Sequence, residues 1–178
     1  MPPHAIEGSK REIETERLRL RPFRAADGDL LYSLYGDDRV MSIRKIGPQT
    51  RAQSDEQLRG IVDHWGRRGF GLWGVFDKAD GAFLGECGLR EIQPGDGEAI
   101  ELTYGLVPEV WGRGLGSEAG RVALDWGFEV ARLETVYAVA RADNRRSRRV
   151  MEKLGFRFEK EWDSGSKRVV RYIVQRTA

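Results

Sequence analysis

The chain has 178 residues and a mass of 20.2 kDa, the size of one ordinary domain with its own hydrophobic core. Its 30 Lys and Arg residues nearly balance 28 Asp and Glu residues, and the resulting charge of +2 excludes a bulk electrostatic attraction to nucleic acid or membranes. Hydrophobic residues make up 40% of the chain, which excludes wholesale disorder. The single cysteine, Cys87, excludes an internal disulfide and favours a reducing compartment.

The N-terminal segment is polar and contains two prolines, so residues 1–14 are expected to form a flexible leader. A single domain is expected over residues 15–176, because no composition shift marks a second one. The N-terminus has no apolar core of a signal peptide, and no stretch approaches the ~18 apolar residues of a membrane span. A cytoplasmic protein without a membrane partner is therefore expected.

Apolar periodicity predicts the secondary structure along the chain. The predicted strands are 17–23, 71–77, 83–92, 99–107, 135–140, 156–162 and 168–175. The predicted helices are 26–35, 50–67, 117–130 and 144–154. This order indicates an α+β (mixed α/β) domain, with a largely antiparallel sheet of about seven strands flanked by about four helices, and not an alternating doubly wound fold.

Glycines are concentrated where one predicted strand passes into a helix, in residues 108–119 (PEVWGRGLGSEA). Gly112, Gly114 and Gly116 alternate there, so the backbone can turn tightly and approach a ligand. The N–H groups at the start of the following helix attract anions. The segment predicts a phosphate or pyrophosphate cradle, although it lacks the Walker A lysine and the Gly-x-Gly-x-x-Gly spacing of dinucleotide folds. A plain glycine-rich connection is the alternative.

Three segments together resemble the GNAT superfamily of N-acetyltransferases, and the resemblance spans about residues 15–176. They are residues 102–119 (LTYGLVPEVWGRGLGSEA), 126–128 (WGF) and 144–156 (NRRSRRVMEKLGF). The resemblance is closest to the Rim-type branch, which acetylates protein N-termini. Gly114 and Gly116 match the family's coenzyme A loop, whereas Trp111 replaces its usual first residue, Arg or Gln, as is common in that branch.

The resemblance implies a GNAT-like domain that binds acetyl-CoA, without a metal, where two strands splay apart. Backbone groups of Leu106 and Val107 would pair with the pantetheine arm, and amides of residues 112–117 would hold the pyrophosphate. The implied cofactor-binding residues are Leu106, Val107, Trp111, Gly112, Arg113, Gly114, Leu115, Gly116, Ser117, Asn144 and Arg149. A backbone N–H near Leu106 would stabilise the oxyanion. Ordinary core packing is the alternative for Leu106 and Val107.

Glu101 is the candidate general base, because a carboxylate inside an apolar strand indicates either a salt bridge or proton transfer. Many family members protonate the departing thiolate with a Tyr at a position near Met151, which this chain lacks. Ser147 is the available hydroxyl, with helix capping as its alternative role. The Asn144 amide is expected to reach the pantetheine arm or a backbone group near the thiol.

A run of arginines precedes and opens the last predicted helix, at positions 141, 145, 146, 148 and 149. It could form an RNA-binding patch, but no aromatic side chains interleave it. A solvated surface with one or two arginines near the 3′-phosphate of coenzyme A is favoured, with no nucleic-acid partner. His4 and His64 form no metal constellation, and Cys87 is expected to be a small core residue.

The resemblance implies direct attack by a primary amine on acetyl-CoA in a ternary complex, with a protein N-terminal α-amine as the expected acceptor. The acceptor is not settled by the sequence, because the helices over residues 26–67 carry mixed charge. An aminoglycoside, an amino acid or a polyamine is an alternative acceptor. A non-catalytic acyl-CoA sensor is a further alternative, and either a monomer or a homodimer is compatible with the sequence.

Overall fold

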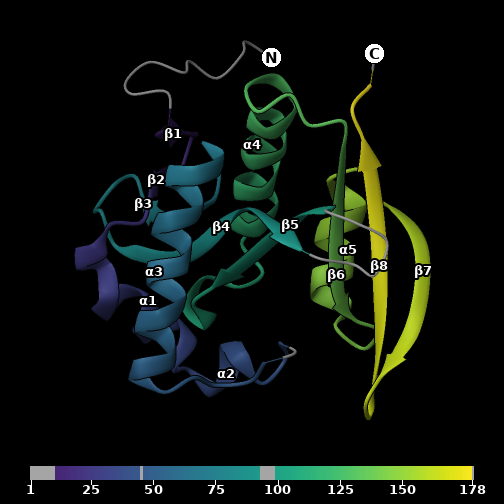
Figure 1. Cartoon of the computed structure of the whole chain (residues 1–178), viewed down its shortest axis with the longest axis horizontal. Helices are drawn as coiled ribbons and strands as arrows, with labels where there is room; N and C mark the ends of the chain where they lie inside the picture. The colour runs from purple at the N-terminus through teal and green to yellow at the C-terminus, as the bar shows by residue number, and fades with distance from the viewer. Residues whose placement is uncertain (1–10, 45, 93–98, 178) are drawn as a thin grey trace.

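The computed structural model describes residues 11–44, 46–92 and 99–177. Within them, eight strands form one sheet in the order β1-β2-β3-β4-β5-β6-β8-β7 (Figure 1). The strands are β1 (Ile13–Glu14), β2 (Leu18–Pro22), β3 (Leu72–Asp77), β4 (Phe83–Ile92), β5 (Ala99–Leu106), β6 (Thr135–Arg141), β7 (Arg157–Ser164) and β8 (Lys167–Gln175). The α-helices are α1 (Gly28–Tyr35), α2 (Asp38–Met41), α3 (Arg51–Arg68), α4 (Leu115–Glu129) and α5 (Arg145–Lys153), with short 3₁₀ turns η1 (Ala25–Asp27) and η2 (Pro108–Val110).

The predicted fold class is confirmed, since every neighbouring pair of strands is antiparallel except β5 and β6. Two short elements escaped prediction. β1 has two residues, too few for an alternating pattern, and α2 has four, begun by the Asp37 side chain accepting a hydrogen bond from the Arg39 N–H. β1 also lies inside the expected leader, whose residues 1–10 are outside the described part of the chain.

The helices cover the sheet at different places. α1 and α3 pack against each other, α4 packs on β4 and β5, and α5 lies beside β6 (Figure 1). Leu89 and Leu102 meet the glycines of α4, so their neighbours in β4 and β5 point to the opposite face. No helix in the described residues is long and apolar enough to cross a membrane.

Three tryptophans join α3, β3 and α4 in the core. The rings of Trp65, Trp73 and Trp126 meet edge to face, with centroids 5.0 to 5.9 Å apart, an arrangement favoured by the aromatic quadrupole. Cys87 is fully buried as predicted, and burial raises the pKa of its thiol. His64 lies in α3, with its Nδ1 2.8 Å from the Phe70 carbonyl oxygen.

The sheet opens between β5 and β6. β5 pairs with β4 along its whole length, but it meets β6 at one register position, Glu101 opposite Tyr137. From there β5 runs away from β6 (Figure 1). This is the splay that the resemblance implied, and it leaves one edge of β5 unpaired by β6 after Glu101.

Candidate active site

The opening between β5 and β6 exposes backbone groups of β5. The N–H of Val107, the residue that follows β5, donates to the Leu84 carbonyl in β4 at 2.9 Å. Because peptide groups alternate in direction along an antiparallel strand, the N–H groups of Tyr104 and Leu106 face the side where β6 has diverged. The Leu106 carbonyl accepts a hydrogen bond from the Trp111 indole at 2.7 Å. The Leu106 N–H is therefore directed into the opening as a donor.

The glycine loop connects η2 to the N-terminus of α4. Gly112 and Gly114 have φ of 76° and 79°, a conformation that L side chains rarely adopt. Gly114 precedes α4, and its carbonyl accepts the first helical hydrogen bond, from the Glu118 N–H at 3.1 Å. The N–H groups of residues 115–117 consequently have no partner inside the helix and lie at its positive end. The helix begins two residues before the predicted Ser117, because Gly114 sets its start.

Gly114 and Gly116, the two glycines that match the family's coenzyme A loop, differ in whether the backbone requires glycine. A Cβ on Gly116 would lie 3.9 Å from Val150 and 4.0 Å from Leu106, which is ordinary contact, and its φ is not left-handed. Gly116 thus lies where α4, α5 and β5 meet. Gly114 is the position at which the backbone conformation itself demands glycine.

Arg146 is the arginine of α5 that borders the loop. Its guanidinium lies 5.0 Å from the centre of the Trp111 ring, a cation–π contact that joins α5 to the loop. Arg113 and Arg149, both predicted cofactor contacts, are exposed. Arg148 instead hydrogen-bonds to Tyr172 and to the Ala142 carbonyl. Arg146 was part of the predicted arginine run but was not among the predicted cofactor contacts, although its spacing of three residues from Arg149 puts the two on one helical face.

Glu101 lies at the last position before β5 leaves β6. It is 6% exposed, and its Oε2 accepts a hydrogen bond from Arg90 Nε and forms an ion pair with Arg90 Nη2, both at 2.9 Å. Arg90 is its register partner on β4. The salt bridge that sequence analysis considered is therefore present, and it does not exclude a second role because the carboxylate also adjoins the opening.

A second buried carboxylate, Glu86, lies on the face of β4 that also carries Arg90. Glu86 is fully buried, accepts a hydrogen bond from the Tyr35 hydroxyl at 2.6 Å and is paired with Arg44 Nη1 at 2.8 Å. Burial, reinforced by the charge of Glu86, raises the pKa of Tyr35. Arg44 lies against β5 so closely that a Cβ on Gly105 would collide with its Nη2. This cluster was not predicted from the sequence, although Glu86 interrupts an apolar strand just as Glu101 does.

Tyr104 links β5 to the first turn of α5. Its hydroxyl lies 2.9 Å from Ser147 Oγ and donates to the Ser147 carbonyl at 3.0 Å. Burial raises the pKa of Tyr104. The capping role considered for Ser147 belongs to Asn144, whose Oδ1 accepts a hydrogen bond from the Ser147 N–H at 3.1 Å. The structure thus brings Asn144, Ser147 and Tyr104 together at the α5 N-terminus.

The sequence matches one family model and several known proteins. Residues 17–157 match the family model described as an acetyltransferase (GNAT) domain. YkkB of Bacillus subtilis (strain 168), whose name assigns no activity, is 31% identical over 157 residues, covering 85% of this chain and 88% of the relative. The spermidine N(1)-acetyltransferase of Escherichia coli (strain K12) is 29% identical over 94 residues, which are 49% of this chain and 50% of that protein.

Solved structures share the fold. A putative GnaT-family acetyltransferase from Bordetella pertussis superposes with a TM-score of 0.81 at 23% identity, covering 92% of this chain and 98% of that one. The ribosomal-protein-S5-alanine acetyltransferase from Vibrio fischeri superposes with a TM-score of 0.76 at 20% identity, covering 92% and 96%. At these identities the likeness concerns the fold.

Proposed function

The chain belongs to the GNAT family of acetyltransferases, and from that premise we propose that this N-acetyltransferase acetylates the α-amine at the N-terminus of a protein or peptide, using acetyl-CoA. The observation that carries the proposal is the divergence of β5 from β6 after Glu101. The end of β5 that follows leads, through Leu106, to the glycine loop and the N–H groups at the start of α4.

The residues around the opening fit coenzyme A. A Cβ on Gly112 would have no atom within 4 Å, so the outer face of the loop has room for a pyrophosphate. Amides of residues 115–117 would bind it, and Arg146 would lie beside the adenosine phosphate. The Leu106 N–H would bind the thioester carbonyl oxygen and hold the negative charge that develops there. Bound acetyl-CoA supplies the activated acetyl thioester.

Proton movements follow from the remaining side chains. Glu101 would first take a proton from the ammonium form of the acceptor, directly or through a water molecule. The resulting neutral amine nitrogen forms a bond to the thioester carbonyl carbon, and the carbon–sulfur bond then breaks. Ser147, hydrogen-bonded to Tyr104, would donate a proton to the departing thiolate. Both hydroxyl groups lie on the α5 side of β5, whereas Glu101 alternates to the opposite side of that strand.

The charge balance near the opening favours an α-amine over a polyamine. Glu86 and Glu101 are each matched by an arginine, so neither offers an uncompensated charge to a multiply charged cation. An α-amine has a reference pKa near ~7.7–8.0 and is roughly 10–15% neutral at pH 7, whereas a Lys amine is below ~0.1%. The ribosomal-protein-S5-alanine acetyltransferase, whose name gives a protein as its acceptor, has the same fold.

Spermidine is the second candidate acceptor. It is favoured by the match to the spermidine N(1)-acetyltransferase, which extends over half of each chain. The two candidates differ in the amine that reacts, and therefore in which blocked compounds remain substrates.

The test is thiol release from acetyl-CoA with matched acceptors. Peptides with a free N-terminus and an internal Lys are compared with the same peptides blocked at the N-terminus, with spermidine and with aminoglycosides. Turnover of the free peptides and loss of turnover on blocking are expected. Faster turnover of spermidine than of any free peptide would refute the α-amine assignment. Coenzyme A binding without turnover of any acceptor would indicate a sensor.

A further inference from the structure

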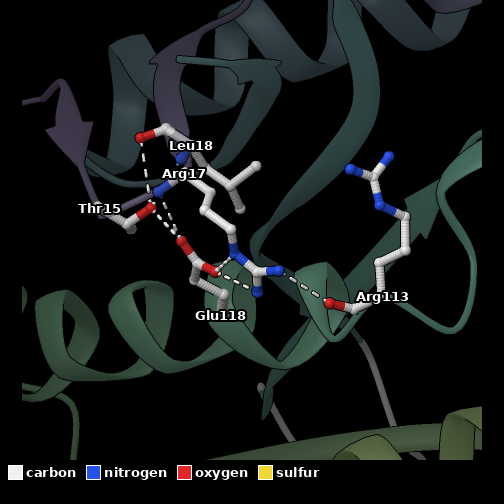
Figure 2. Close-up of polar contacts among 5 residues, drawn as sticks. All are labelled: Thr15, Arg17, Leu18, Arg113 and Glu118. Atoms are coloured by element: carbon white, nitrogen blue, oxygen red, sulfur yellow. Dashed lines mark hydrogen bonds and ion pairs between the residues drawn. The ribbon is translucent and has the colours of Figure 1, made fainter. Parts of the chain in front are cut away.

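The turn between β1 and β2 is attached to the glycine loop by one arginine. Nε and Nη2 of Arg17 contact Glu118 Oε2 at 2.7 and 2.6 Å, and Nη1 donates to the Arg113 carbonyl at 3.0 Å. Figure 2 shows the guanidinium lying between these two groups. Arg17 therefore connects the N-terminal hairpin with both the loop and the first turn of α4.

The other oxygen of Glu118 is also bound by this turn. Oε1 accepts hydrogen bonds from Thr15 Oγ1 at 2.5 Å and from the Arg17 N–H at 3.0 Å. Thr15 Oγ1 is itself fixed by the Leu18 N–H at 2.9 Å (Figure 2). Although burial opposes ionisation, the hydrogen bonds from Thr15 and Arg17 lower the pKa of Glu118. Glu118 is therefore a permanent negative charge near neutral pH.

That charge lies at the end of α4 where a pyrophosphate would bind. An acidic side chain in the first turn of a helix is attracted by the same partial positive charge that attracts a bound anion. Without a counterion, Glu118 would repel the pyrophosphate. Arg17 supplies the counterion, so Glu118 stabilises the helix end without leaving the site negative.

The contact to Arg113 has a geometric consequence. A trans peptide is planar, and its N–H points opposite to its carbonyl. Because Arg17 holds the Arg113 carbonyl oxygen, the N–H of Gly114 in the same peptide is turned away from Arg17. That donor then joins the N–H groups of residues 115–117 at the loop.

We propose that Arg17 and Glu118 form a positioning pair for the coenzyme A loop. Arg17 orients the Arg113–Gly114 peptide and neutralises Glu118, so both residues control cofactor affinity without contacting the reacting atoms. The proposal rests on the use of coenzyme A in the proposed function. Its chemistry is separate, because it concerns pyrophosphate binding and leaves the choice of amine unaffected.

Calorimetric titration with coenzyme A tests the pair. Arg17→Gln is expected to raise Kd roughly 5- to 20-fold, since it removes a charge-assisted contact from a half-exposed arginine. Arg17→Lys keeps the charge but cannot reach both acceptors, so an intermediate Kd is expected. In turnover assays KM for acetyl-CoA should rise in parallel, while kcat at saturation changes by less than about twofold.

Arg21→Gln is the matched control. Arg21 lies in β2, the strand that begins directly after Arg17, and forms a two-point ion pair with Asp27 at 2.7 and 3.0 Å, away from the loop. It is expected to lower the melting temperature at least as much as Arg17→Gln while leaving Kd unchanged. An equal rise in Kd for Arg21→Gln and Arg17→Gln would overturn the positioning role, because general destabilisation would then explain both.

A double-mutant cycle separates charge from structure. If Arg17 compensates Glu118, adding Glu118→Gln to Arg17→Gln should recover Kd severalfold, and strictly additive effects on binding would overturn this part. Wild-type affinity in Arg17→Gln, with normal turnover by the wild-type protein, would overturn the positioning pair alone. Failure of the wild-type protein to bind coenzyme A would overturn the proposed function, and the pair with it.

Discussion

The substitution Glu101→Gln separates the two roles that Glu101 can have, as general base and as partner of Arg90. Gln keeps the shape of the side chain but removes the proton acceptor. Loss of a general base typically lowers the rate ~10²–10⁴-fold, so kcat/KM should fall by that order at pH 7. Binding of acetyl-CoA should change little, because the implied cofactor contacts lie at the end of β5 and on the loop, α4 and α5, and do not include Glu101.

The loss in kcat/KM caused by Glu101→Gln should also depend on pH. An α-amine that is roughly 10–15% neutral at pH 7 is more than about 90% neutral at pH 9. The loss in kcat/KM should therefore shrink about six- to ninefold across this range, because most of the amine then arrives without its proton. The corresponding loss for a Lys-like amine should be larger at pH 7, since far less of it is neutral.

Arg90→Gln removes the same ion pair and leaves the carboxylate in place. The Arg90 side chain is 42% exposed and that of Glu101 is 8% exposed. After allowance for solvent screening, either substitution should cost about 1 kcal/mol, or roughly 2–4 °C in Tm for a chain of this size. Thiol release from acetyl-CoA is measured from pH 6.5 to 9 for both variants. Equal losses of activity in the two would refute the general-base role and leave Glu101 as a structural partner.

Three further outcomes follow. Gly114→Asp, in the glycine loop, and Gly81→Asp, in the β3–β4 turn, both place a side chain at left-handed φ. Only Gly114→Asp should abolish coenzyme A binding, because it puts a carboxylate against the N–H groups at the start of α4. Titration of both variants with coenzyme A checks this. Arg146→Glu should weaken binding of coenzyme A more than binding of its 3′-dephospho form. Equal weakening of the two would place Arg146 away from the 3′-phosphate. Burial opposes ionisation of Asp27, but hydrogen bonds from Arg21 and from the Arg24 N–H lower the pKa of its carboxyl group. Asp27→Asn should therefore destabilise the protein by ~1–3 kcal/mol at pH 7. Urea titrations should show this difference shrinking as pH falls below about 4, the unfolded pKa, and disappearing only below the lowered pKa of the folded carboxylate.

Local patterns predicted most elements because each carries its signal in neighbouring residues. The capping box of Thr50 and Gln53 begins α3, and the left-handed Gly69 ends it. α4 shows how such a signal can be displaced: Ser117 looked like its first residue, yet the left-handed Gly114 allows the helix to begin at Leu115. β1 has two residues and exists only through its pairing with β2, so no pattern of its own could reveal it.

The sequence by itself determined the glycine loop, the buried acid in β5 and the resemblance to N-acetyltransferases, since these depend on residue types at fixed spacings. Tertiary structure alone decided which side chains meet. Arg17 and Glu118 are 101 positions apart, Tyr104 and Ser147 are 43 apart, and Arg44 and Glu86 are 42 apart. Each pair joins separate segments of the chain, and an isolated Arg or Tyr has no local periodicity that points to a distant partner. Strand order and helix packing bring them together, and burial strengthens the Tyr104–Ser147 and Arg44–Glu86 contacts.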